Sequence, residues 1–451
     1  YEYDGNLLIT TTDALGGQVV NTYDDQNLLI WTVDHGVATT YGYDQFGQMT
    51  AVTDALSHVT TYEYDSVGRL VETTEAANTP LARTTVNEYD DGDNLVRVTQ
   101  NYLAGYPQNY YVPSSQGGTG GGYYNLVTEY EYDAAGNRTA VTDTLGHVTR
   151  HWYDAANRLV RTIVNYDPGV SDHGPDNDWN VATRYGYDEV GNQTHITDTL
   201  GRVTRSWYDD LNRLVGTTVN YDPATYPDYG PDDEWNLTTL YGYDAVGNQT
   251  HVTDPLGCVT RSWYDAANRL ISNTVNYTTA QGADTNLTTH YIYDAVGNRV
   301  VMTDATGIAT GYGYDELGRL IAVTENYSVT GPTDHQTNVR TEYGYDALGN
   351  RTVVTDANGH ATHYAYDALG HLVAETDPMN HTTAYGYDAL GNRTVVTDAD
   401  GGVTVYTYDT LSRLTNIQYP DSSTQYAYDA AGNRTTMTDS SGTTTYAYDE
   451  L

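Results

Sequence analysis

The chain has 451 residues, with 46 tyrosines against one phenylalanine, and its 60 acidic residues face 20 arginines and no lysine, which gives a formal net charge of −40. Such a field repels DNA, RNA and anionic lipid, which proteins bind through clustered Lys and Arg, so a nucleic-acid partner is excluded. No apolar run reaches the roughly 20 residues that a membrane-spanning helix needs. A content of 39% hydrophobic and 12% aromatic residues argues against disorder and favours a folded, β-rich protein.

The two ends of the chain lie inside one recurring pattern. Residues 1–6 (YEYDGN) and 446–451 (YAYDEL) are copies of the same motif. We therefore expect this chain to be a segment of a longer polypeptide whose targeting signals lie elsewhere. Cys258 is the single cysteine, so a scaffold of intrachain disulfides is excluded.

A Tyr-Asp pair recurs in register nineteen times, at a spacing of 20 or 21 residues where the pattern is unbroken. Each copy contains two turn signals. In the copy 383–406, Asp388 and Asp398 each begin a turn, and a Gly follows three residues later, where φ must be positive. The segments between turns alternate with a period of two and are rich in Tyr, Thr and Val, which is typical of strands. The tyrosines of the pairs are Tyr3, Tyr23, Tyr43, Tyr64, Tyr89, Tyr132, Tyr153, Tyr187, Tyr208, Tyr243, Tyr264, Tyr293, Tyr314, Tyr345, Tyr366, Tyr387, Tyr408, Tyr428 and Tyr448.

Two short strands per copy, joined by tight turns, predict antiparallel pairing between neighbours in the chain. The predicted fold class is all-β: a long antiparallel β-meander of tandem repeats with nearly forty strands. Because right-handed twist accumulates along so long a sheet, we expect a spiralling strip that forms a hollow shell or a filament shaft.

Arginines follow the first turn of many copies. Eleven of the 20 come four or five residues after the aspartate of the Tyr-Asp pair, as Arg413 follows Asp409 and Arg393 follows Asp388. We expect them to pair with turn carboxylates, where an exposed pair contributes only about 0 to 1 kcal/mol. Their predicted role is therefore control of register and charge.

Insertions lengthen the array at one edge of the predicted sheet. Residues 1–451 are predicted as one continuous array of about nineteen repeats, and each insertion opens with an Asn-Tyr step, such as Asn165-Tyr166. The glycine-rich part of the first insertion is predicted to be a mobile loop. The insertions lie near 101–125, 165–181, 220–238, 276–288 and 326–339.

The motifs YDxxGRL and YDxxGNRT, followed about ten residues later by TDxxG, resemble the YD or Rhs repeat over essentially the whole chain. The resemblance implies a long β-strip that spirals into a hollow cocoon, as in Rhs and Tc-toxin shells and in teneurin-like proteins. It also implies a secreted or surface-exposed protein. The Asp-Pro-x-Gly motifs that the family's toxins use for self-cleavage have one near match, Asp377-Pro378-Met379-Asn380, which lacks the glycine. No protease residue is carried over.

Two related insertions gather carboxylates, the hard oxygen ligands that calcium prefers. No complete EF-hand loop is present, so a solvated acidic loop is the alternative interpretation. The candidate calcium ligands, which represent the one possible cofactor, are Asp172, Asp176, Asp178, Asp228, Asp232 and Asp233.

Glycosylation is a second candidate modification. Many N-x-[ST] sequons arise because a turn asparagine precedes a strand threonine, so the motif alone is weak evidence. Asn276 and Asn326 lie in insertions and are the preferred candidates.

The candidate catalytic and metal-binding residues are better explained as structural residues of the repeat. Cys258 could be a nucleophile, but the equivalent repeat positions hold His147, Arg202 and His360, so it is a turn-flanking surface residue. His360 and His363 could be metal ligands, but His360 occupies the same turn position. No catalytic residue is predicted.

We predict a non-enzymatic structural segment of a secreted or cell-surface protein, which forms a β-shell or a filament shaft. One alternative is an adhesin that binds glycans or cell-surface proteins through its edge insertions, and another is the encapsulating shell of a polymorphic toxin. The expected partners are other parts of the same chain or further copies of it. The tyrosine excess suits such a wall, because a ring with a hydroxyl can cover a half-wet face and hydrogen-bond across it.

Overall fold

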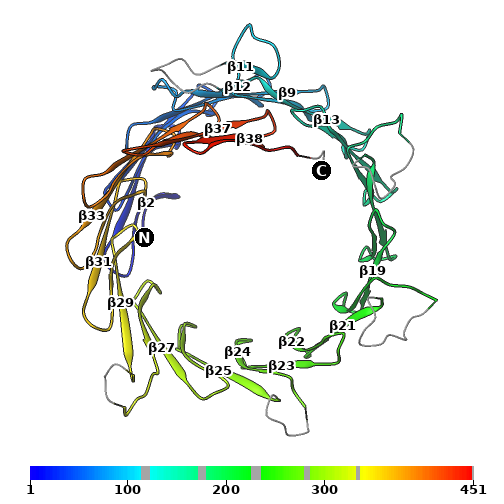
Figure 1. Cartoon of the computed structure of the whole chain (residues 1–451), viewed down its shortest axis with the longest axis vertical. Helices are drawn as coiled ribbons and strands as arrows, with labels where there is room; N and C mark the ends of the chain where they lie inside the picture. The colour runs from blue at the N-terminus through cyan, green and yellow to red at the C-terminus, as the bar shows by residue number, and fades with distance from the viewer. Residues whose placement is uncertain (113–121, 171–178, 225–234, 279–284, 332–335, 449–451) are drawn as a thin grey trace. The chain divides into compact units, whose positions relative to one another are not determined.

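The computed structural model describes all residues except 113–121, 171–178, 225–234, 279–284, 332–335 and 449–451. The described residues form 39 β-strands and no helix, which confirms the predicted all-β fold (Figure 1). Of these strands, 37 belong to one sheet, and β11 and β12 form a separate two-stranded ribbon. The chain divides into two compact units: unit 1 comprises Tyr1–Val148 and Glu342–Glu450, and unit 2 comprises Thr149–Thr341.

Unit 1 contains the first and last repeats. Its strands pair antiparallel with their neighbours in the chain, and β10 pairs with β13 across the first insertion. They are β1 (Glu2–Asp4), β2 (Leu7–Thr12), β3 (Gln18–Tyr23), β4 (Leu29–Asp34), β5 (Val37–Tyr43), β6 (Met49–Thr53), β7 (Val59–Tyr64), β8 (Leu70–Glu75), β9 (Arg83–Tyr89), β10 (Leu95–Gln100), β11 (Tyr110–Val112), β12 (Gly122–Tyr124), β13 (Leu126–Tyr132), β14 (Arg138–Thr142), β30 (Arg351–Thr355), β31 (Ala361–Tyr366), β32 (Leu372–Thr376), β33 (Thr382–Tyr387), β34 (Arg393–Thr397), β35 (Val403–Tyr408), β36 (Leu414–Gln418), β37 (Ser423–Tyr428), β38 (Arg434–Asp439) and β39 (Gly442–Thr445).

Unit 2 contains the middle repeats, with the same antiparallel pairing. The strands β15 (Val148–Tyr153) and β29 (Val339–Tyr345) contain the unit boundaries. Between them lie β16 (Leu159–Val164), β17 (Val181–Tyr187), β18 (Gln193–Thr197), β19 (Val203–Tyr208), β20 (Leu214–Val219), β21 (Leu237–Tyr243), β22 (Gln249–Thr253), β23 (Val259–Tyr264), β24 (Leu270–Val275), β25 (Leu287–Tyr293), β26 (Arg299–Thr303), β27 (Ala309–Tyr314) and β28 (Leu320–Glu325).

The Tyr-Asp turn is built by its aspartate. The backbone N–H of Asp388 donates to the carbonyl of Asn392, and the N–H of Gly391 donates to the carbonyl of Asp388. The carboxylate Oδ1 of Asp388 accepts the N–H groups of Leu390 at 3.0 Å and Asn392 at 2.9 Å. Gly391 has a φ of 80°, so this position favours Gly or Asn.

The second turn of the repeat has the same geometry. Asp398 N–H donates to the carbonyl of Gly402, and Oδ1 of Asp398 accepts the N–H groups of Asp400 and Gly402. Both turn types therefore depend on an aspartate at the entrance and a left-handed residue three positions later, as the sequence pattern predicts.

The tyrosine of the Tyr-Asp pair joins each repeat to the one before it. Tyr387 Oη donates to the carbonyl of Leu372, the first residue of β32, across 2.9 Å. A phenylalanine could not make this bond, which explains the use of tyrosine at this position of the repeat. The same bond is made by Tyr23, Tyr43, Tyr64, Tyr89, Tyr132, Tyr187, Tyr208, Tyr243, Tyr264, Tyr293, Tyr314, Tyr366, Tyr408, Tyr428 and Tyr448.

Few described side chains are fully buried, because one sheet layer cannot cover both of its own faces. The buried apolar residues are small or lie near the first insertion, as Ala140, Leu126 and Val127 do. In the described part of the chain no helix is long and apolar enough to cross a membrane.

Candidate functional site

The predicted calcium ligands Asp172, Asp176, Asp178, Asp228, Asp232 and Asp233 lie outside the described residues, so calcium binding stays a prediction. Among the residues that the structure does describe, no three His, Cys, Asp or Glu side chains gather in a way that could hold a metal ion. His360 pairs with Asp356 in its turn at 3.1 Å, whereas His363 lies on β31 opposite Thr376. Cys258 is exposed in a turn.

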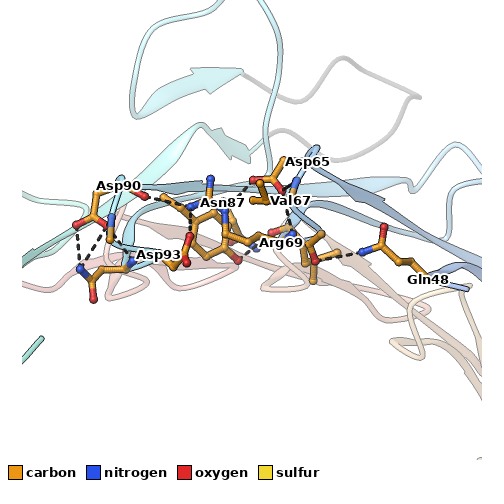
Figure 2. A network of polar contacts seen from close by, with 12 residues as sticks. Gln48, Asp65, Val67, Arg69, Asn87, Asp90 and Asp93 are labelled. Carbon is orange, nitrogen blue, oxygen red and sulfur yellow. Dashed lines mark hydrogen bonds and ion pairs between the residues drawn. The ribbon is translucent and has the colours of Figure 1, made fainter. Parts of the chain in front are cut away.

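A polar network runs along the edge formed by the Tyr-Asp turns, and Figure 2 shows one link of it around Arg69. The Nε of Arg69 donates to Asp65 Oδ2 at 2.7 Å within the turn. Its NH1 reaches the next repeat, where it donates to the carbonyl of Asp90 at 3.0 Å and to Asp93 Oδ1 at 2.7 Å. The guanidinium also lies 4.8 Å from the ring centre of Tyr89. One arginine thus joins two successive repeats.

Hydrogen bonds from Arg69 hold the pKa of the Asp65 carboxyl below its ordinary value, first through the backbone N–H and then through the guanidinium. The side-chain hydrogen bond with Asp65 in turn raises the pKa of Arg69. The pair therefore stays fully charged at neutral pH.

The pairing within the turn recurs at the other arginines that follow the aspartate of a Tyr-Asp pair by four residues. Each pairs with its own turn aspartate at 2.7 Å, which confirms the predicted carboxylate pairing for this group. Some of these arginines also donate a hydrogen bond from NH1 to the backbone carbonyl of the aspartate in the next Tyr-Asp pair. They are Arg69, Arg158, Arg213, Arg269 and Arg413.

The arginines that follow by five residues make a different contact. Arg393 lies over the rings of Tyr385 and Tyr406, and Arg434 lies over Tyr426 and Tyr446. In these turns an asparagine stands four residues after the aspartate and donates to its carboxylate in place of an arginine. Asn392 Nδ2, for example, donates to Asp388 Oδ2 at 3.0 Å. The prediction of carboxylate pairing therefore misses the role of this second group, because one extra residue places the guanidinium against rings instead.

A pair of asparagines forms the base of each insertion. At the second insertion, Asn180 N–H donates to the carbonyl of Asn165 at 2.9 Å. The Asn180 side chain accepts the N–H of Asp167 and donates to the carbonyl of Asp167, each at 3.0 Å. Both asparagines have a positive φ and are at most 4% exposed. The equivalent pairs are Asn101 with Asn125, Asn220 with Asn236, Asn276 with Asn286, and Asn326 with Asn338.

The sequence pattern predicts the opening Asn-Tyr step of each insertion but not the asparagine that closes it. These pairs also bear on the proposed glycosylation. Asn276 is half-buried, whereas Asn326 is exposed and donates its amide to the carbonyl of Gln336. Glycosylation at Asn276 and Asn326 stays a prediction.

Unit 1 contains a seam, which we define as the contact between residues 73–144 and residues 388–432. Asn101 Nδ2 donates to Thr410 Oγ1 at 2.6 Å, and Thr144 Oγ1 donates to the carbonyl of Ala430 at 3.2 Å. On the side of the last repeats, these contacts are made by the turn between β35 and β36 and the turn between β37 and β38. The hydrogen bonds across the seam involve side chains. The strands on each side therefore keep their backbone hydrogen bonds to their own neighbours in the sheet.

The seam buries groups that are exposed in equivalent turns. The side chain of Asp409 is 3% exposed, against 24% for Asp209 at the same turn position in unit 2. Leu411 is half-buried, whereas its counterpart Leu211 is 70% exposed. The contact therefore covers the turn edge of the last repeats.

A cavity of about 290 Å³ lies within the seam. Its lining includes the apolar residues Pro80 and Leu81 and the polar residues Tyr124, Tyr406 and Asp409. Burial raises the pKa of the Tyr124 hydroxyl above its ordinary value. The seam therefore contains a cavity lined by both apolar and polar residues.

Comparison with known families identifies the repeat. The family model described as RHS Repeat matches more than half of the chain. This chain belongs to the RHS repeat family. The RHS matches cover residues 23–58, 43–80, 125–148, 132–165, 243–284, 293–330, 328–362, 366–403, 394–424 and 421–444.

One curated relative of this RHS chain is double-stranded DNA deaminase toxin A of Burkholderia cenocepacia (strain H111). It is 30% identical over an alignment of 202 residues, and the match covers 41% of this chain and 12% of the toxin. The match therefore spans only about an eighth of that protein.

Solved structures share the fold of the RHS repeats. The crystal structure of TcdB2-TccC3-Cdc42 superposes with a TM-score of 0.69 at 17% identity, over 95% of this chain and 24% of that one. A structure of the Photorhabdus luminescens Tc holotoxin pore gives a TM-score of 0.70 at 17% identity, over 94% of this chain and 23% of that one. The predicted resemblance to Tc-toxin strips is confirmed for the fold.

Proposed function

We propose that this RHS chain is a non-enzymatic wall segment of a secreted or cell-surface protein, and that the wall encloses a polypeptide. The observation that carries the proposal is the seam of unit 1. There the last repeats lie against the first ones through side chains, as in a strip that turns back on itself. A filament shaft would instead leave these edges free for another copy of the chain.

The family and the fold support an enclosing role. The relative in Burkholderia cenocepacia is named as a toxin, and a strip of the same fold occurs in Tc-toxin chains. We assign no catalytic step to this chain. Any enzymatic activity would belong to a part of the full-length protein other than these repeats.

Protease protection in the full-length gene product tests the enclosure. A protease added to the folded protein should cut the insertions while a segment encoded downstream of residue 451 remains intact. After the strip is unfolded in urea and the same protease is applied, that segment should be cut. Equal cleavage of the segment before and after unfolding would contradict enclosure.

We further propose that the insertions bind glycans or cell-surface proteins, with calcium held by the acidic loops. The paired asparagines support this role, because they close each insertion at its base. Deleting 171–178 and 225–234 between intact pairs should abolish binding to cells and leave the strip folded. Unchanged binding by a folded deletion variant would exclude the proposal.

A further inference from the structure

The turn 409–413 departs from the repeat pattern at the position after its aspartate. Thr410 is the only threonine at this position among the nineteen copies, and Ala is the commonest residue there. Its Oγ1 accepts the hydrogen bond of Asn101 across the seam at 2.6 Å. Ser66 carries the other hydroxyl at this position but lies outside the seam, whereas the Thr410 hydroxyl contacts the first repeats.

A second departure occurs two residues later. Ser412 has a φ of 62°, in the left-handed region where most other copies have Gly or Asn. Its Oγ lies 3.4 Å from NH1 of Arg83 across the seam and 3.2 Å from Asn392 Nδ2 of the preceding repeat. A serine is strained here relative to glycine, so its presence at this position fits a role in the seam.

The surface that the turn 409–413 contacts fits it closely. Asn101 is 3% exposed and is held in place because its Nδ2 also donates to the carbonyl of Tyr123 at 2.7 Å. Gly122 lies so close that a Cβ on it would stand 2.4 Å from Thr410 Oγ1. On the other side of the turn, the guanidinium of Arg413 lies 5.8 Å from the ring centre of Tyr123.

We propose that the turn 409–413 is a docking key, specified by Thr410 and Ser412, which selects the one place where the last repeats seat on the first. A strip of near-identical turns could otherwise dock in several registers, one repeat apart, at similar free energy. Specificity needs a feature that the neighbouring turns lack. The two hydroxyls supply it, and Arg83 and Asn101 recognise them.

This role goes beyond the proposed enclosure, because the key sets the seam whether or not a polypeptide lies inside. The chain itself provides the substitutions for a test. Thr410→Ala and Ser412→Gly restore residues that stand at the same positions in other copies, such as Ala134 and Gly318. The altered turn should therefore fold, and Ser412→Gly should relieve its strain.

The experiment measures the distance between spin labels on Asp91→Cys and Ser440→Cys, both exposed and away from the key, with Cys258→Ser in all variants. The parent should give one narrow distance distribution. The T410A/S412G variant should lose that peak and give a broad or shifted one, while its circular dichroism spectrum remains that of the parent. Thr410→Val, which keeps the shape and removes the hydroxyl, should broaden the peak in part.

Ser66→Ala is the matched control, because it removes a hydroxyl at the same turn position outside the seam. It should leave the parent peak unchanged. The proposal is overturned if T410A/S412G retains the parent peak, or if Ser66→Ala broadens the peak as much as the key variant does. Neither result depends on protease protection of an enclosed segment.

Discussion

The phenolic oxygen of Tyr43 lies 2.9 Å from the carbonyl oxygen of Leu29, and this bond ties β5 to the repeat that precedes it. Burial also raises the pKa of the Tyr43 hydroxyl above its ordinary value, so it remains a donor at all ordinary pH values. The same bond occurs along the array and gives the tyrosines of the Tyr-Asp pairs a structural role.

Tyr43→Phe should make local opening of β4 and β5 easier by about 1 kcal/mol, because the Leu29 carbonyl loses its donor. Hydrogen exchange of the β4 and β5 amides should accelerate by about fivefold to tenfold. Tyr41→Phe in the same strand is the control, since the described structure gives the Tyr41 hydroxyl no hydrogen bond. Equal acceleration in both variants would show that the tyrosine hydroxyl bond contributes nothing.

Arg69→Gln should accelerate exchange in both turns that the arginine joins, 65–69 and 90–94, because it removes contacts with Asp65, Asp90 and Asp93 at once. Arg202→Gln is the matched control, since Arg202 is 55% exposed and its ion pair is with Asp198 of its own turn. Its effect should be smaller and confined to one turn. An effect of Arg69→Gln that stops at its own turn would contradict the link between repeats.

Asn180→Ala should destabilise the base of the second insertion by about 2 to 3 kcal/mol, because it removes side-chain hydrogen bonds and places alanine at a φ of 57°. Asn180→Gly should cost less, since glycine tolerates that φ and only the side-chain bonds are lost. Exchange of the β16 and β17 amides measures both. Equal costs would mean that backbone strain plays no part.

His35 joins two turns, since it contacts Asp34 of its own turn and Asp13 of the β2–β3 turn. Hydrogen bonds to Asp34 and then Asp13 raise the pKa of His35 above 6.5. The stability that it contributes is therefore complete below pH 6.5 and is lost as the pH rises through the raised pKa. Local exchange, corrected for the intrinsic rate, should accelerate across that range, and His35→Asn, which tolerates the positive φ, should remove the dependence. If local exchange in the parent protein did not change with pH over this range, the role of His35 would be contradicted.

Acid should weaken the turns. Hydrogen bonds lower the pKa of many turn carboxyls. The largest contribution comes from the Asn137 side chain in the case of Asp133, and from the Arg213 side chain in the case of Asp209. Their contribution is complete above the unfolded value near 3.8 and is lost as the pH falls through the lowered folded values. Circular dichroism should show the sheet intact at pH 5 and melting below about pH 4. Melting that begins well above pH 5 would contradict this assignment.

The repeat pattern was sufficient to predict the turns, the antiparallel meander and the pairing of arginines such as Arg69, because these depend on residues close in the chain. The seam could not be predicted in the same way, because Asn101 and Thr410 lie 309 residues apart and no local sequence pattern relates them. A signal was nevertheless present, since Thr410 and Ser412 break the pattern of their turn. The acidic insertion residues lie outside the described residues, so their predicted calcium role is unchanged.

Electron microscopy of the purified chain tests the central claim most directly. If the strip turns back on itself at the seam, images should show discrete, curved particles of uniform size, and light scattering should give the mass of one chain at all concentrations. Long fibres, or a mass that grows with concentration, would show that the edges join copy to copy and would contradict the account.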